Sequence, residues 1–190
     1  MTVAISLLIL RINFYLTTVE NQLKDLGASP DKAKSFTEIF NYVLPLCGAA
    51  MVPLIGYVLV RLGYSCAFFV IATLNLIYSG TALIPSVNAQ IITFVTYAMG
   101  RPFVFATMSA YVGELFGYAN FGKLYGLVRI CGSLATALQY PLALQALHSG
   151  TFLYVNLGFL GVSLLVFLFP FWVWRVLFWG NLTRPTYDFF

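Results

Sequence analysis

The chain has 190 residues, of which 61% are hydrophobic and only 8% are charged, and its mean hydropathy is +0.88. A soluble domain carries roughly 25% charged residues, so this composition excludes packing around one soluble core and indicates a polytopic membrane protein. The net charge of +4 is spread thinly along the chain, which argues against nucleic acid as a partner and leaves the lipid bilayer as the expected surrounding.

Six apolar runs are each long enough for a helix that crosses a bilayer, which takes about 20 residues. A helix satisfies its own backbone groups in lipid, whereas these runs are too long and too evenly apolar for barrel strands. We therefore predict an all-α polytopic membrane protein with six transmembrane helices, at about Val3–Leu23, Phe36–Val60, Cys66–Ile84, Ile91–Val112, Leu124–Ala146 and Phe152–Trp174.

The connections between these runs differ in length and polarity. The first, Asn21–Ser35, is the one sizeable polar connection: Gly27 is expected to end the first helix, and Ser29-Pro30-Asp31 to begin the next as N-cap, first helical residue and first-turn acid. Lysines and arginines in the loops favour a cytoplasmic tail over 179–190, although the first loop is also basic. The remaining connections are expected to be short, at Arg61–Ser65, Pro85–Gln90, Gly113–Gly122 and His148–Gly150.

The fourth run carries a charge in the middle of an apolar span, where a charge is costly and marks a candidate functional site. Arg101 directly precedes Pro102 and follows Tyr97 by one turn. Proline cannot donate to the carbonyl of Ala98, so we expect a kinked helix with a free carbonyl beside a guanidinium, as occurs at substrate sites in transporters. The guanidinium fork suits a carboxylate. The alternative is a structural arginine that pairs with carbonyls of a neighbouring helix.

The first run is also polar along one side. Arg11, Tyr15, Thr18 and Gln22 share one helical face, and Asn13 lies on roughly the opposite face. A helix with this pattern should not be mostly exposed to lipid. For Arg11 the alternative is a side chain that snorkels to the membrane surface. In the second run, Asn41 lies near the outer end and is a candidate for lining the mouth of a cavity.

The fifth run should bend at Gln139-Tyr140-Pro141, and its Arg129 is expected to act near a cytoplasmic gate or to snorkel. Isolated asparagines at 75 and 156 are expected to form interhelical hydrogen bonds. The three cysteines, at 47, 66 and 131, have no metal or redox spacing, and no catalytic triad, phosphate loop or metal cluster occurs. We therefore expect no enzyme activity, no cofactor and no metal.

The loop after the second run resembles the loop motif of the major facilitator superfamily, which reads glycine, three variable residues, an acid, a base, one variable residue and glycine. Gly56, Arg61 and Gly63 match this motif, whereas Val60 replaces the acid. The resemblance implies that these residues lie at a gating loop, and Lys123 and Arg129 are the other candidates for gating. The absent acid removes the partner that Arg61 would have in a gating ion pair.

Four further segments resemble the L-type large-neutral-amino-acid transporter branch, which is sodium-independent and also contains a purine-nucleobase carrier. They are Arg11-Ile-Asn-Phe-Tyr15, Gly100-Arg-Pro-Phe103, Phe121-Gly-Lys-Leu-Tyr-Gly-Leu127 and Leu138-Gln-Tyr-Pro141. The resemblance covers nearly the whole chain. It implies that the chain corresponds to the last six helices of a twelve-helix protein and that residues upstream are missing. It further implies two inverted three-helix repeats, at 1–86 and 87–178, with the tail at 179–190.

This resemblance implies a facilitative transporter of small organic solutes, most simply neutral amino acids, that works by alternating access in the plasma membrane. The substrate would be bound by Arg101, Tyr97, Arg11, Asn13, Tyr15 and Asn41, and the missing N-terminal half would be a partner. Two alternatives stay open. The substrate could be a nucleobase or another uncharged solute, with Arg101 structural, or the six-helix chain could be a non-transporting membrane subunit.

Overall fold

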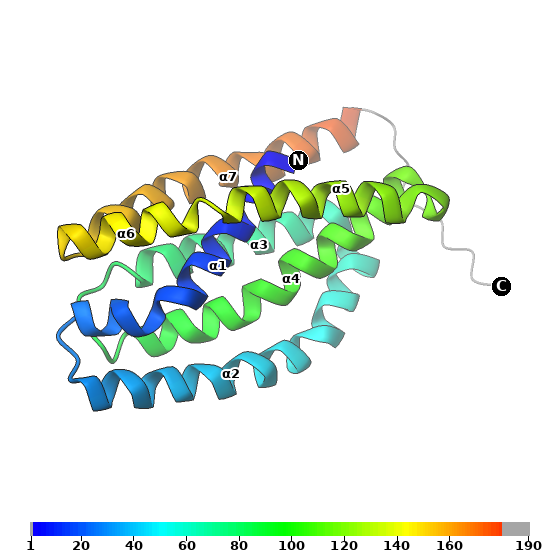
Figure 1. Cartoon of the computed structure of the whole chain (residues 1–190). Coiled ribbons are helices and arrows are strands. Elements are labelled where there is room, and N and C mark those ends of the chain that lie inside the picture. Colours follow the sequence, from blue (N-terminus) through cyan, green and yellow to red (C-terminus); the bar gives the residue numbers. More distant parts are fainter. Residues whose placement is uncertain (1, 180–190) are drawn as a thin grey trace.

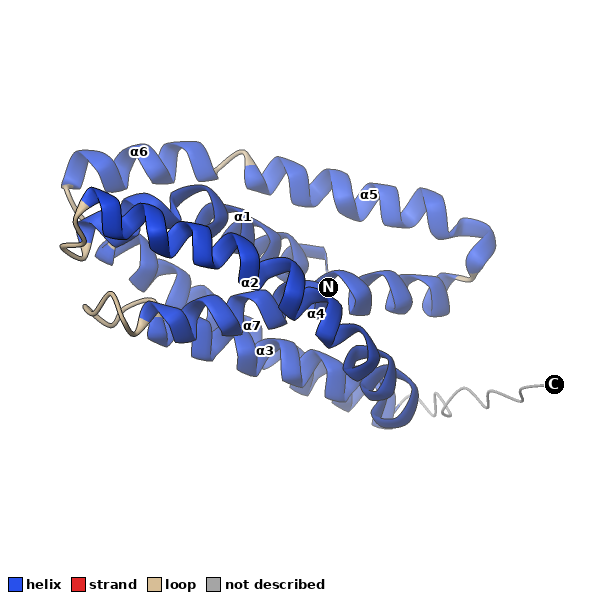
Figure 2. Ribbon diagram, turned by 90° about the horizontal axis from the view of Figure 1, so that it is seen from below, coloured by secondary structure: helices blue, strands red, loops and turns tan. Residues whose placement is uncertain are grey.

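The computed structural model describes residues 2–179, and this part of the chain is helical with no strand (Figure 1). An all-α fold was predicted, and this part of the prediction is confirmed. The helices pack side by side with short turns at both ends of the bundle (Figure 2). They are α1 (Thr2–Asp25), α2 (Pro30–Tyr57), the π-helix η1 (Val58–Leu62), α3 (Gly63–Thr81), α4 (Gln90–Phe116), α5 (Tyr118–Thr136), α6 (Gln139–Ser149) and α7 (Leu153–Trp179).

Four helical stretches among the described residues are long and apolar enough to cross a membrane: Val3–Asp25, Pro30–Thr81, Gln90–Phe116 and Tyr118–Ser149. The second has 52 residues because it joins α2, η1 and α3. The chain turns back within it at Gly63, whose φ of 80° favours glycine. Each of the six predicted apolar runs lies on helix, and six membrane crossings stay a prediction.

The helices pack around two central ones, α1 and α4. Helix α1 packs mainly on α5, while α4 lies between α2 and α3, and α3 also packs on α7 (Figures 1 and 2). Most of α1 is buried, whereas α2 and the α5–α6 stretch are largely exposed. The predicted polar face of α1 explains this position, because Arg11, Tyr15, Thr18 and Gln22 are all buried.

The first connection forms as the sequence predicts. Gly27 has a φ of 82° and ends the turn after α1. The Ser29 side chain then accepts a hydrogen bond of 3.4 Å from the backbone N–H of Lys32, and Pro30 begins α2. The polar segment is nevertheless shorter than expected, because α1 continues to Asp25.

Two predicted connections are wrong in extent. The predicted loop Gly113–Gly122 is almost entirely helical, since α4 continues to Phe116 and α5 begins at Tyr118. Gly117 between them adopts a φ of 72°, which lets one residue reverse the chain. In the same way, the predicted loop Arg61–Ser65 reduces to the turn at Gly63.

Beside Arg101 we predicted a kinked helix; α4 runs through Pro102 as one continuous helix, so the chain does not break there, and the kink stays a prediction. The break lies instead in the fifth run, where α5 ends at Thr136 and α6 begins at Gln139, as the sequence of that run predicts. Pro141 cannot donate to the carbonyl of Ala137, which receives only the N–H of Tyr140, at 3.4 Å. Exposure alone does not explain this difference, since the largely exposed α2 also continues through Pro45 and Pro53.

At the end of the bundle where α1 finishes, a residue of α1 holds the start of α7. The Asp25 carboxylate accepts hydrogen bonds from the backbone N–H of Phe152, at 2.9 Å, and from the Thr151 hydroxyl, at 3.3 Å. A carboxylate at a helix N-terminus satisfies an orphan donor and favours the helix dipole. This contact fixes where α7 begins relative to the buried face of α1.

The α1–α5 contact depends on a small residue. A Cβ atom placed on Gly132 would lie 3.0 Å from Cδ1 of the buried Ile9, whereas one on Gly126 of the same helix meets nothing within 4 Å. We expect Gly132→Val to lower the free energy of unfolding by about 1–3 kcal/mol through overpacking. Thermal unfolding in detergent micelles measures this, with Gly126→Val as the matched control. Equal destabilisation by both variants would contradict a packing role for Gly132.

Candidate functional site

The deepest charge of the bundle is Arg11. Its residue is 2% exposed, and its guanidinium carbon lies 4.4 Å from the ring centroid of Tyr78 and 5.0 Å from that of Phe159. None of its three guanidinium nitrogens has a hydrogen-bond partner among residues 2–179. The side chain therefore does not snorkel to the surface, and two aromatic faces stabilise its charge.

Tyrosines from three helices surround this arginine. Tyr15 of α1, Tyr78 of α3 and Tyr97 of α4 have ring centroids 5.2 to 5.6 Å apart in every pairing. Two of their hydroxyls are engaged, since Tyr97 donates to the carbonyl of Ile12 at 2.9 Å and Tyr15 donates to Oε1 of Gln90 at 3.4 Å. These bonds and ring contacts tie α1 to α3 and α4 at mid-height.

Arg101 approaches the same tyrosines from α4. It is half-buried and lines a crevice of about 20 Å³ together with Tyr78, Tyr97 and residues of α1 and α3. A space of this size holds roughly one water molecule. Within the described chain no side chain or carbonyl forms a hydrogen bond or ion pair with Arg101, so the alternative of a carbonyl-paired structural arginine finds no support.

The opposite face of α1 meets the break between α5 and α6. Asn13 is half-buried and donates through Nδ2 to the Thr136 hydroxyl at 3.3 Å, and Thr136 donates in turn to the carbonyl of Gly132 at 2.8 Å. Beside the break, Oε1 of Gln139 is buried without a hydrogen-bond partner among the residues described. This second polar cluster therefore offers an unused acceptor.

Two side-chain hydrogen bonds join α7 to neighbouring helices, one on either side of Phe159 along α7. Asn75 donates to the Ser163 hydroxyl at 3.0 Å, and Asn156 donates to Oε1 of Gln22 at 3.2 Å. The predicted interhelical role of both asparagines is confirmed. These bonds hold α7 against α3 and α1 and thereby hold Phe159 over Arg11.

The structure thus brings four of the predicted substrate-binding residues together: Arg11, Tyr15, Tyr97 and Arg101. Asn13 belongs to the separate cluster at the α5–α6 break. Asn41 is exposed on α2 and contacts neither cluster in any hydrogen bond among the described residues.

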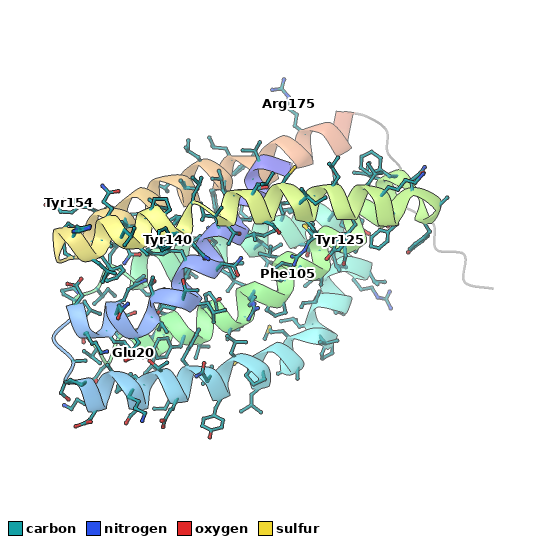
Figure 3. All side chains as sticks on the ribbon, in the orientation of Figure 1. Glu20, Phe105, Tyr125, Tyr140, Tyr154 and Arg175 are labelled. Carbon is teal, nitrogen blue, oxygen red and sulfur yellow. The ribbon has the colours of Figure 1, made fainter. Side chains whose placement is uncertain are left out.

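Four of the five predicted gating residues lie at the end of the bundle where α3 and α5 begin, whereas Arg129 lies past the middle of α5. Gly56, Arg61 and Lys123 are exposed, and Gly63 forms the turn. Arg129 is also exposed, with its guanidinium carbon 5.0 Å from the ring centroid of Phe105, which projects between α4 and α5 beside Tyr125 (Figure 3). At this end Tyr64 donates to the Glu114 carboxylate at 2.7 Å and joins α3 to α4.

Sequence reasoning missed three residues of the central cluster: Tyr78, Phe159 and Gln90. Tyr78 and Phe159 belong to runs without charge, and only the helix packing reveals that they face Arg11. For Tyr78, the one feature of the sequence that could have indicated a role in the cluster was a polar phenol group inside an otherwise apolar run. Chemically, the cluster offers cations and aromatic faces, and no group of three metal-ligating side chains occurs in the described part.

No family model and no solved structure matches the chain. It is 35% identical over 125 residues to Protein FMP42 of Saccharomyces cerevisiae, a match that covers 65% of this chain and 25% of that protein. It is 34% identical over 104 residues to the equilibrative nucleobase transporter 1 of Bos taurus, covering 54% and 21%. It is also 34% identical over 105 residues to the large neutral amino acids transporter small subunit 3 of Homo sapiens, covering 54% and 19%. The matched stretch is a quarter or less of each relative's length.

The pairing of Arg11 with Tyr78 is testable by a double-mutant cycle. We expect Arg11→Met and Tyr78→Leu to couple by about 1–2 kcal/mol, the range for a desolvated cation–π contact. Tyr78→Phe keeps the ring and should retain most of the coupling. Thermal unfolding of the four proteins measures the coupling, and a value near zero would show that the aromatic faces do not stabilise the cation.

Proposed function

We propose that this chain is the C-terminal six-helix half of a facilitative transporter of small solutes, with neutral amino acids as the substrate class. Apolar helices of spanning length and relatives that are named transporters rather than enzymes support an integral membrane protein that moves small solutes. The amino-acid substrate, the twelve-helix major facilitator fold and the plasma membrane as its location are part of this proposal.

One observation carries the choice of substrate: Arg101 is a half-buried cation without a partner in the described chain. A guanidinium in this position binds a carboxylate through two parallel hydrogen bonds. Arg11 contacts Tyr78, which packs on Tyr97, so a carboxylate beside Arg101 would also reduce the cost of that second buried charge. The remainder of an apolar amino acid would meet the tyrosine rings.

The helix packing supports the arrangement as two repeats of three helical passes. The pairs α1–α5 and α2–α4 both join residues before 86 to residues after 87. If α1 corresponds to α4 and α2 to α5, these two pairs are equivalent, as a two-fold relation between the repeats requires. Arg11 and Arg101 then lie in corresponding helices.

The size of the crevice fits a transporter half in a closed arrangement. About 20 Å³ beside Arg101 is far below the roughly 300–1,000 Å³ of a small-molecule site. Binding therefore requires α4 to move relative to α1 or α3, or the absent half to supply the remaining walls. Both occur when one half rocks against the other in alternating access.

A nucleobase is the second candidate, and a specific observation favours it. Gln139 has a buried, unused acceptor beside the α5–α6 break, and the Asn13 amide bonds to Thr136, the last residue of α5 before that break. Amides pair with the hydrogen-bonding edge of an uncharged base, and the identity to the nucleobase transporter equals that to the amino-acid transporter subunit. In this case Arg101 would not contact the substrate.

The two candidates separate in an uptake experiment with the full-length protein. We expect Arg101→Gln to reduce labelled leucine uptake about 10- to 100-fold, because a charge-assisted hydrogen bond contributes about 1.5–3 kcal/mol. Leucinol, which lacks the carboxylate, should compete weakly with leucine. Lys34→Gln, which removes an exposed cation on α2, is the matched control and should transport normally at equal surface level.

Normal leucine uptake by the Arg101 variant would contradict the carboxylate assignment. Competition by adenine that is stronger than competition by leucine would favour the nucleobase candidate. In that case we expect Gln139→Ala to reduce adenine uptake and Asn41→Ala, an exposed amide on α2, to leave it unchanged.

A further inference from the structure

A wide apolar groove lies on the outer side of the bundle, away from the arginine cluster. It has a volume of about 700 Å³ and lies between α3 and α7, which run side by side in Figure 2. Its lining is Leu62, Ser65, Cys66, Phe69, Val70, Thr73 and Leu74 from one stripe of the chain, and Phe171 from α7. The volume is that of a small-molecule site rather than of a packing defect.

The polar atoms of the groove do not provide a site for a polar ligand. The Thr73 hydroxyl donates to the carbonyl of Phe69 in its own helix, at 2.9 Å, and Ser65 is the other hydroxyl in the lining. The exposed ring of Phe69 stacks edge-on against Phe171 at 5.2 Å and forms part of the floor. The occupant must therefore be apolar along most of its length.

The length of the groove matches one leaflet of a bilayer. The lining of α3 runs from Ser65 to Leu74, which is about 14 Å along a helix axis at 1.5 Å per residue, and Leu62 lies before the turn at Gly63. Half of a hydrocarbon core of about 30 Å is about 15 Å. The groove begins where the chain turns at Gly63, at one end of the bundle, and ends near the middle of α3. A single acyl chain that enters from one membrane surface has this reach.

Cations follow both walls of the groove at the same end. Arg61 directly precedes Leu62 and is exposed. Arg175 lies one turn beyond Phe171 on α7, and its side chain extends away from the helix (Figure 3). At a membrane surface each such arginine attracts an anionic headgroup by about 1 kcal/mol, so the charge at the mouth is complementary to a negative lipid.

From these observations we infer that the α3–α7 groove binds one anionic phospholipid, with an acyl chain along Phe69 and Val70 and the phosphate beside Arg61. Most of the groove lies on the other side of α3 from the arginine cluster, and Leu74 lines both the groove and the crevice beside Arg101. The inference does not depend on which substrate is bound in that crevice. A neutral sterol lacks the charge that the arginines would attract. We commit to a phospholipid rather than a free fatty acid because an anionic phospholipid is the amphiphile that a bilayer itself presents to this groove.

Native mass spectrometry of the purified full-length protein tests this inference. The protein is reconstituted in phosphatidylcholine with 20 mol% phosphatidylserine and released with the lipids that it retains. We expect retained phosphatidylserine to exceed phosphatidylcholine, and Arg61→Gln to reduce it about fivefold, the factor that corresponds to about 1 kcal/mol. Lys123→Gln, an exposed cation on α5 at the same end, is the charge-matched control.

A second pair of variants tests the groove itself without disturbing the interior. Thr73→Phe fills the groove, whereas Ile77→Phe adds a ring one turn beyond it, and both positions are exposed. We expect only the first to reduce retained lipid, with leucine uptake unaffected in either. Three results would each overturn the inference. They are equal retention of the two lipids, equal loss of lipid in Arg61→Gln and Lys123→Gln, and equal loss of lipid in Thr73→Phe and Ile77→Phe.

Discussion

The fold depends on the burial of one guanidinium at mid-span. Insertion of an arginine into the centre of a membrane helix costs about 2.5–3.5 kcal/mol, and Arg11 has no acid or hydrogen-bond acceptor to offset this cost among residues 2–179. The aromatic faces of Tyr78 and Phe159 stabilise it in part. They do so only while α3 and α7 hold their positions against α1, so the charge and the packing of three helices depend on each other.

The same constraint explains why α4 carries the site. Tyr97 packs against Tyr15 and Tyr78 and bonds the carbonyl of Ile12, which fixes α4 against α1. Arg101, one turn later, therefore lies close to a cluster that already contains a cation. Two like charges near one low-dielectric cluster repel each other, and a bound anion would remove that repulsion. This is a physical reason for substrate binding to be favourable here without a carboxylate from the protein.

Periodicity in the sequence was enough to predict the buried face of α1, because Arg11, Tyr15, Thr18 and Gln22 recur within a single helix. It could not identify Tyr78 or Phe159, since their role depends on how separate helices pack. The prolines show the same limit. Pro102 and Pro141 have the same local chemistry, yet only Pro141 lies beside a break between two helices, and the local sequence does not distinguish them. Gly117 likewise replaces a long loop with one residue in a left-handed conformation.

The distribution of polar side chains indicates which side of the bundle suits lipid and which does not. The exposed side of α3 and α7 is apolar, with its groove lined by aliphatic and aromatic groups. The exposed polar residues Thr17, Glu20 and Asn41 lie on α1 and α2. Lipid cannot hydrogen-bond such groups, so their side must meet water or another protein surface. The half-exposed Asn13 and the break beside it lie on that same polar face of α1. A cavity between two halves would therefore have the α5–α6 break in its wall, with Arg101 behind α1 at its inner edge.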